Sequence, residues 1–374
     1  MAIEGGGSKT IDWTRAYTLA ALQLVVTLGW MAYGHFMPSL LERFGLSALS
    51  GLLSVYLVLA GATFAPLIGS VGDRIASRGG KRFPLVVTGG LFAGITFLTV
   101  AFMIAAPPEG LVRWLFLAGI MIWIAAMVVL QTPALSLLPS VASAERWPSV
   151  VSPLVVATVL PTALWPLLRR ALDAFGGPAV YIGGGLLVFV ATYLLRNAFA
   201  EPAPGAMRMA TPTERAPGGG LGAAPSVVFA IGIVSAFITR LAYDVVPTIL
   251  TARLGSGDAA PALLSAATLG STTLLAPPLG GLSGRLGSRR GALGSVALAV
   301  ACAAIAPFAA SVVVAGAIAI VLGAALALHL DCALPFSLQS LPPERAGLSA
   351  GLYLGGIFAG SQLAPLAAWL GMWG

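Results

Sequence analysis

The sequence predicts an all-α polytopic membrane protein with about eleven transmembrane helices. Hydrophobic residues make up 58% of its 374 residues and charged residues only 9%, against roughly 25% charged in an ordinary soluble domain. The mean hydropathy is +0.95. Such a composition excludes a soluble globule, which lacks the polar surface it needs here, and a disordered chain, which is poor in apolar residues.

Eleven mostly apolar runs divide the chain, each near the 20 residues or so that a spanning helix needs. We expect spans at about 16–41, 49–70, 84–105, 111–138, 149–171, 178–199, 224–252, 260–283, 291–309, 312–340 and 347–371. The Pro- and Gly-rich stretch 200–223 has no apolar periodicity and predicts a cytoplasmic linker. The expected organisation is therefore a tail at 1–15, a six-helix bundle at 16–199, the linker, and a five-helix bundle at 224–374.

The basic residues indicate the orientation of the chain. If the N-terminus is cytoplasmic, fourteen of the 20 Lys and Arg residues fall on the inner side and five on the outer side. Because basic residues gather on the cytoplasmic side of membrane proteins, this favours an inside N-terminus. We expect an integral protein of the plasma (inner) membrane.

The two sides of the linker repeat each other. Ala65-Pro66-Leu67-Ile68-Gly69 through Asp73-Arg74 aligns with Ala276-Pro277-Pro278-Leu279-Gly280 through Gly284-Arg285, at an offset of about 211. Pro38 to Leu41 aligns with Pro247 to Leu250, and Leu135 to Arg146 aligns with Leu334 to Arg345. An even number of spans separates the copies, so both have the same orientation, as in parallel repeats related by an axis along the membrane normal.

These features resemble the major facilitator superfamily of transporters. The segment Gly69 to Arg74, with Arg78, Lys81 and Arg82, is similar to that family's signature Gly-x-x-x-Asp-Arg-x-Gly-Arg-Arg loop. The resemblance implies two parallel-repeat helix bundles that rock about a central site and move a small solute by alternating access. It also implies that Gly69, Asp73, Arg74, Arg78, Gly280 and Arg285 form a gate loop that meets helix eleven when the cytoplasmic side is closed.

Two details qualify the resemblance. The second half is shorter by roughly 33 residues, about one span and a loop, so the sequence is either a natural eleven-span variant or has lost its final helix. Gln131 to Pro139, followed by Glu145-Arg146, is similar to a fourth-helix motif of the glycoside–pentoside–hexuronide cation symporters.

Ionisable side chains inside the spans are costly and usually functional. They are His35, Arg240, Asp244, His329 and Asp331, on spans one, seven and ten, to which span four adds Gln131. In the resembled family these four helices line the central cavity.

Each of these groups has two interpretations. Arg240 and Asp244 share a helix face: Asp244 binds a proton or cation and Arg240 a polar or anionic solute group, or the pair merely fastens the helix. His35, aligned with Asp244 in the repeat, relays protons or bonds to nearby backbone. Asp331, with His329 nearby, is a second proton site or inner gate, or an interfacial residue.

Aromatic residues complete the predicted cavity. Trp30, Tyr33 and Tyr243 provide stacking surfaces and hydrogen bonds, or they belong to the interfacial aromatic belt.

The expected function is secondary active transport of a small solute, coupled to protons by symport. The alternative is a non-transporting membrane assembly or partner-binding protein on the same scaffold. No catalytic constellation, metal-ligand cluster or phosphate loop stands out, so we expect no enzyme activity, no cofactor and no nucleic-acid partner. The expected partners are the solute, protons and the lipid bilayer, with the protein a monomer.

Overall fold

The computed structural model describes residues 11–78, 83–200, 223–254 and 260–369, which are helical and contain no strand. Most of the predicted linker and tail, as well as Lys81 and Arg82, lie outside these residues.

The long helices are α1 (Trp13–Arg43), α2 (Ser50–Leu59), α3 (Ala65–Ser77), α4 (Phe83–Ala105), α5 (Leu111–Leu135), α6 (Trp147–Ala163), α7 (Trp165–Ala200), α8 (Pro225–Arg240), α9 (Val246–Leu254), α10 (Ala260–Leu286), α11 (Ser288–Ile305), α12 (Val312–Ser340) and α13 (Ala346–Trp369). The π-helical turns η2 (Ala60–Phe64) and η5 (Leu241–Val245) join α2 to α3 and α8 to α9. Short 3₁₀ turns are η1 (Ser47–Leu49), η3 (Leu138–Ser140), η4 (Ala144–Arg146), η6 (Ala306–Phe308) and η7 (Pro343–Arg345).

The predicted membrane-spanning architecture is confirmed. In the described part of the chain, nine helices are long and apolar enough to cross a bilayer. The helices α6 and α13 run beside them, so a helix stands at each of the eleven predicted spans. The chain is therefore an all-α integral membrane protein.

Local signals explain why these segments are helical within a bilayer. Asp12 accepts a hydrogen bond from the backbone N–H of Arg15 and caps α1. Ser311 caps α12 in the same way. Many serine and threonine hydroxyls inside the helices donate to the carbonyl of the preceding turn, as Thr132 does to Val128. Because these polar groups are satisfied within their own helix, they are tolerated in the membrane.

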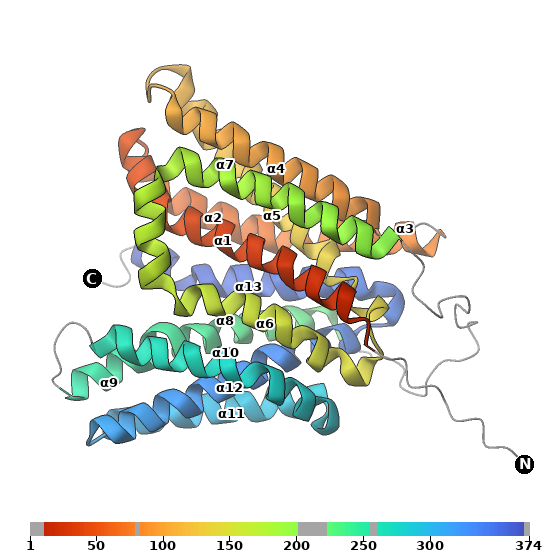
Figure 1. Cartoon of the computed structure of the whole chain (residues 1–374), viewed down its shortest axis with the longest axis vertical. Helices are drawn as coiled ribbons and strands as arrows, with labels where there is room; N and C mark the ends of the chain where they lie inside the picture. The colour runs from red at the N-terminus through yellow and green to blue at the C-terminus, as the bar shows by residue number, and fades with distance from the viewer. Residues whose placement is uncertain (1–10, 79–82, 201–222, 255–259, 370–374) are drawn as a thin grey trace, which may run out of the picture.

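The fifth predicted span differs from its expected extent. Helix α6 ends at Ala163, not near residue 171, and α7 begins at Trp165. Leu164 leaves helical geometry, and Pro166 has no N–H with which to continue the earlier helix. A second break follows at Gly176, whose φ of 75° and ψ of 161° suit glycine alone. The segment Trp165–Phe175 is therefore a short helix that lies across one end of the bundle (Figure 1).

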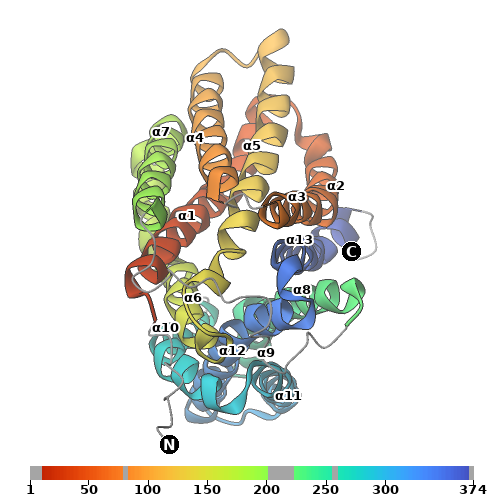
Figure 2. The same cartoon turned by 90° about the vertical axis from the view of Figure 1, so that its right-hand side faces the viewer.

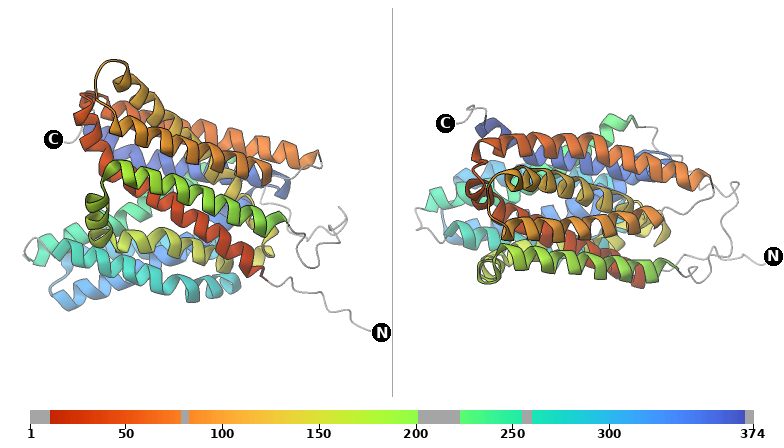
Figure 3. Two further views of the ribbon diagram at one scale, coloured as in Figure 1. Left: turned by 45° about the horizontal axis from the view of Figure 1, so that its top comes forward. Right: turned by 90° about the horizontal axis from the view of Figure 1, so that it is seen from above.

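The helices form two halves with similar packing. We call the end where α1 begins the tail end and the opposite end the far end. Seen from the tail end, α1 to α5 and α7 occupy one half and α8 to α12 the other (Figure 2). In both halves the third and fourth spans pack together, as α4 on α5 and α11 on α12. Further views show the long helices crossing the molecule in roughly the same direction (Figure 3).

Two helix pairs join the halves. Helix α13 lies between α8 and the α2–α3 span, and α6 packs on α10. Three glycines on one face of α13, Gly347, Gly351 and Gly355, contact the backbone of the α2–α3 span. A Cβ atom at Gly351 would overlap the carbonyl oxygen of Ala65. The seam between α13 and α3 is therefore a contact of backbone on backbone, which only small residues permit.

Gly351→Ala tests this seam. We expect it to lower the free energy of unfolding by about 1–3 kcal/mol, because added volume in a closed contact forces the backbones apart. Gly294→Ala on α11 is the matched control, since its Cβ would meet no atom within 4 Å. Alanine should there be neutral or stabilise the helix slightly. Thermal unfolding of both variants in detergent is the measurement, and equal midpoints would contradict the seam.

Candidate functional site

We call the contact of α13 with the α2–α3 span the first seam and the contact of α6 with α10 the second seam. One carboxylate closes the tail end of the first seam. Asp73, near the end of α3, is 9% exposed. Its Oδ1 accepts a hydrogen bond from the N–H of Gly347 and its Oδ2 one from the N–H of Leu348, both at 2.8 Å. These donors belong to the first turn of α13, where the helix dipole favours a negative charge. Asp73 of one half therefore caps a helix of the other half.

The remaining predicted gate-loop residues divide into two groups. Gly69 packs against the carbonyl of Gly347, beside the carboxylate cap. Arg74, Arg78 and Arg285 carry exposed side chains at the tail end.

The second seam repeats the first without its cap. Gly280, the repeat partner of Gly69, packs against Pro148 and Ser152 of α6. Ser149 Oγ donates to the carbonyl of Gly280 at 3.3 Å. Gly284 stands where Asp73 stands in the first copy, and Pro148, aligned with Gly347, has no N–H to be capped. The carboxylate-to-backbone cap therefore exists on one seam only.

A cluster of aromatic rings connects the halves nearer the middle of the bundle. Trp30 and Tyr33 of α1 surround Trp123 of α5, with Trp30 5.1 Å and Tyr33 5.4 Å from it between ring centroids. Phe358 of α13 adds a ring 5.5 Å from Trp30. Trp30 and Tyr33 are half-buried. The structure thus brings both predicted aromatic residues of α1 together and adds Phe358, which sequence reasoning missed because only the fold places α13 beside α1.

Gln131 belongs to a small polar group on the first half. Its Nε2 donates to Oε1 of Gln23 on α1 at 3.4 Å, and Gln23 Nε2 donates to Thr158 Oγ1 of α6 at 3.3 Å. Three helices thus share one amide pair. Gln23 was the missed member, although it is an amide inside an apolar run and could have been found by the same criterion as Gln131.

Arg240, the last residue of α8, and Asp244, within the π-helical turn η5, form the predicted ion pair. Arg240 Nη1 lies 3.8 Å from Asp244 Oδ2, with side chains 46% and 58% exposed. The π-helical turn that separates them is a local widening of the helix that often accompanies functional sites. Tyr243 in the same turn is half-buried and faces Thr162 of α6, in the other half.

His35 is paired with a residue that the sequence did not single out. Its Nε2 donates to Oδ1 of Asp173 at 2.7 Å, and its ring meets that of Trp165 edge-on. Both partners lie on the short helix at the start of α7. Arg169, four residues before Asp173, approaches the same carboxylate at 4.0 Å. The Arg169–Asp173 spacing was the available signal, but the early end of α6 at Ala163, which leaves this segment free to lie over α1, was not expected.

His329 is enclosed within the second half. It is 1% exposed, and its Nε2 and Nδ1 lie 2.9 Å from Ser235 Oγ of α8 and 3.1 Å from Ser295 Oγ of α11. Both ring nitrogens are therefore bonded between α8, α11 and α12. In this position the histidine ties three helices of one half together.

Asp331 is the unusual group of the site. It is 0% exposed, and neither carboxyl oxygen has a hydrogen-bond partner among the described residues. It faces Ser152 of α6, but the Ser152 hydroxyl already donates to the carbonyl of Pro148 at 3.0 Å. The hydroxyl group has one proton and can rotate, so Ser152 can donate either to Pro148 or to a carboxylate on Asp331, or accept from a protonated Asp331.

Ser152 also borders open space. It lines a cavity of about 620 Å³ between α1, α6 and α10 at the tail end of the second seam. Ser152 thus borders this cavity and also faces the buried carboxyl group. Among the described residues no group of three His, Cys, Asp or Glu side chains is arranged to hold a metal ion.

The buried carboxyl group has a measurable effect on stability. Thr132 is the repeat partner of Asp331, is equally buried, and satisfies its hydroxyl within its own helix. We expect Asp331→Thr to raise the free energy of unfolding by about 1–3 kcal/mol, the penalty of an unsatisfied buried polar group. The reciprocal change Thr132→Asp should destabilise by at least as much. Thermal unfolding of both variants is the measurement, and a destabilised Asp331→Thr would show that the carboxyl group is satisfied.

Comparisons with known proteins agree with this architecture. The solved human organic anion transporter MFSD10 (TETRAN) superposes with a TM-score of 0.62 at 17% identity, covering 96% of this chain and 95% of that one. A bacterial homologue of the iron transporter ferroportin, in an outward-facing state, gives 0.66 at 19%, covering 95% and 91%. The transporter FucP, in the outward conformation, gives 0.64 at 13%, covering 95% and 92%.

At the level of sequence, no curated protein matches the chain. The family model of the Major Facilitator Superfamily, however, matches residues 19–370. That model spans both halves and both seams, and the structural neighbours are transporters and not enzymes. The chain therefore belongs to the Major Facilitator Superfamily.

Proposed function

We propose that this protein is a secondary active transporter of the plasma membrane, which moves a small solute by alternating access and couples that movement to protons. The N-terminus and the tail end face the cytoplasm, in keeping with the positive-inside distribution of Lys and Arg. The protein works as a monomer. The observation that carries the proposal is the enclosed carboxyl group of Asp331 beside the seam between α6 and α10, whose oxygens accept no hydrogen bond from the part of the chain that the structure describes.

The solute binds along the inner faces of the two halves. Trp30 and Tyr33, half-buried and backed by the enclosed ring of Trp123, provide an apolar stacking surface that reaches Phe358 of the other half. Arg240 and Asp244 supply exposed charge of both signs. A solute with an apolar body and a polar or anionic group fits this combination, because a few charged groups set orientation while rings supply contact area.

The proton sites are the carboxyl groups of Asp331 and Asp244, whose exposure to water changes as the seams between the halves open and close. With the tail end closed, Asp331 is enclosed, and an enclosed carboxyl group without a partner is least costly when it carries a proton. Separation of α6 from α12 at the tail end exposes Asp331 to water and allows the proton to leave. Asp244, the exposed partner of Arg240, exchanges protons with water or binds the solute when the far end is open.

The gate at the tail end is held by the Asp73 cap. Opening this end separates α3 from α13 and breaks both hydrogen bonds from Gly347 and Leu348. The second seam has no such cap, so the closed state depends on one carboxylate. Hydrogen bonds to a charged group contribute about 1.5–3 kcal/mol each, enough to set the balance between the two conformations.

Proton coupling is tested by Asp244→Asn in proteoliposomes. The transported solute is first identified by a thermal-shift screen of solutes at several pH values. We expect the variant to lose accumulation driven by an imposed pH gradient while keeping part of its solute exchange, because exchange needs no net proton movement. Glu109→Gln, which removes an exposed carboxylate at the far end, should accumulate normally. Unchanged accumulation by Asp244→Asn would remove Asp244 from the coupling role.

The gate is tested by Asp73→Ala. Spin labels at Ser77→Cys and Glu344→Cys, both exposed positions at the tail end, report the separation of α3 from α13. We expect the open population to rise at least tenfold, because two charge-assisted hydrogen bonds are lost. Arg289→Gln removes an exposed charge from the same end without touching the cap and serves as control. Identical distance distributions in wild type and Asp73→Ala would contradict the gate.

A further inference from the structure

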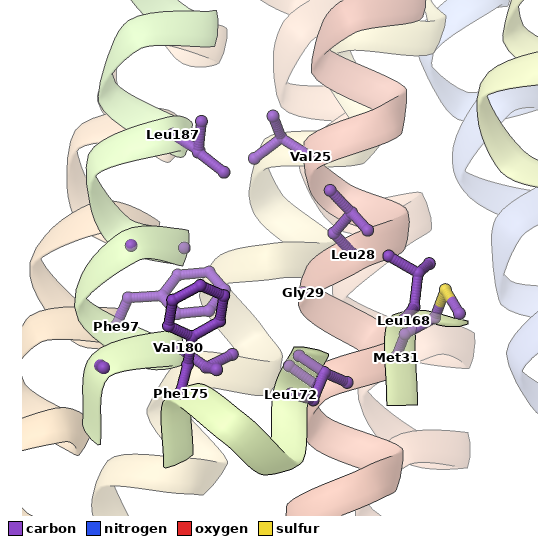
Figure 4. A pocket seen from close by; sticks show the side chains of 14 residues that line it. Val25, Leu28, Gly29, Met31, Phe97, Leu168, Leu172, Phe175, Val180 and Leu187 are labelled. Carbon is purple, nitrogen blue, oxygen red and sulfur yellow. The ribbon is translucent and has the colours of Figure 1, made fainter. Parts of the chain in front are cut away.

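An apolar cavity lies away from both seams, between α1, α4 and α7. Its volume is about 370 Å³, within the range of small-molecule sites. Val25, Leu28 and Met31 of α1 form one wall, and Phe97 of α4 forms the back (Figure 4). The side chains that line it carry only carbon, hydrogen and sulfur, so it suits a hydrocarbon and offers nothing to water.

The cavity exists because α7 is broken at Gly176. The short helix before the break turns Leu168, Leu172 and Phe175 over one end of the space, and the long helix after it contributes Val180 and Leu187 (Figure 4). Glycines at the floor keep it open. Gly183 of α7 has nothing within 4 Å of an added Cβ, so no side chain of the protein occupies this volume.

The cavity opens toward the membrane. Phe175 is 72% exposed and Leu187 is 46% exposed, both on the outer surface of the half that contains α7. In a membrane protein such apolar exposure faces lipid. The space is thus an indentation of the lipid-facing surface, directly under a helix that lies across the far end of the bundle.

Positive charge accompanies the apolar surface on the same short helix. Arg169 and Arg170 are both exposed. Arg169 shares its charge with Asp173 at 4.0 Å, whereas Arg170 forms no ion pair within the described part of the chain. A long arginine side chain reaches from such a helix toward the polar region of a bilayer, where a headgroup phosphate can accept hydrogen bonds from its guanidinium group.

We propose that this cavity binds one acyl chain of an anionic phospholipid, whose headgroup phosphate is held by Arg170 with help from Arg169. The apolar walls select a hydrocarbon chain, and the arginines select the negative headgroup. The bound chain fills the angle between the two parts of α7 and so fixes the short helix that carries Trp165 and Asp173 against His35. The site is separate from the Asp73 cap, whereas its back wall, Phe97, touches Trp123 of the aromatic cluster at 5.2 Å between ring centroids.

The test measures lipid binding directly. The purified full chain, delipidated in detergent, is titrated with phosphatidylglycerol or phosphatidylcholine of identical acyl chains and analysed by native mass spectrometry. We expect phosphatidylglycerol to bind about fivefold to tenfold more tightly, as one to two arginine contacts imply. A third titration with glycerol phosphate, which has the headgroup charge without acyl chains, should give no binding.

Variants separate the two parts of the site. Gly183→Leu places a side chain in the cavity from a position where an added Cβ meets no atom within 4 Å, and it should abolish binding of both lipids. Ala179→Leu, at an exposed rim position, serves if Gly183→Leu fails to fold. The double change Arg169→Gln and Arg170→Gln should keep chain binding and remove the preference for phosphatidylglycerol.

Matched controls lie elsewhere on the lipid-facing surface. Gly294→Leu adds the same volume at an open position of α11, and Arg253→Gln removes an exposed charge at the end of α9. Both should bind lipid as the wild type does. Undiminished binding by the filled variants, or equal affinity of the wild type for the two lipids, would overturn the proposal.

Discussion

The two halves are held together by contacts in which backbone touches backbone across glycine. A membrane offers no hydrophobic drive for helices to associate, so close packing must supply it. Gly347, Gly351 and Gly355 bring α13 against the α2–α3 span, and Gly280 brings α10 against α6. Everything that distinguishes this molecule is arranged about these seams: the cap on one of them, the buried acid beside the other, and the aromatic cluster that reaches across the first to Phe358. Glycine keeps the number of interlocking side chains at these seams small, with Phe358 of α13 packed on Gly61 and Ser152 of α6 on Gly280.

The two copies of the repeat pack their helices in the same way but carry different side chains at the seams. Asp73 caps α13, while the equivalent position of the second copy is Gly284 and the equivalent helix begins with Pro148. Proline has no backbone N–H, so the second seam lacks the hydrogen-bond donor as well as the carboxylate acceptor. In its neighbourhood stands Asp331, a carboxyl group without a partner among the described residues. One seam thus carries a carboxylate that bonds across it, and the other has an enclosed carboxyl group beside it.

The remaining charged groups show how the fold manages charge inside a membrane. Arg240 meets Asp244, His35 meets Asp173, and His329 is bonded by two serines. Each partner lowers the cost of keeping a polar group away from water. These polar groups also differ in their exposure and in the helices that they join. His329 lies within one half and joins its helices, whereas Arg240 and Asp244 are half-exposed and available to a ligand. Position within the bundle, and not the residue type, distinguishes a structural group from a candidate binding group.

Composition and periodicity alone determined the helical membrane class, the eleven spans and the parallel repeat, because apolar length and repeated motifs are local properties of a chain. The signature segment also identified Asp73, since its residues are contiguous. The partners of the candidate site were decided by tertiary structure. Asp173 reaches His35 only because the chain leaves helical geometry at Leu164, before the end near 171 expected for the fifth span, and again at Gly176. Phe358 reaches Trp30, and Ser152 faces Asp331, only through helix pairs more than a hundred residues apart. Such contacts depend on how helices rotate and cross, which small shifts in packing decide and which no periodicity records.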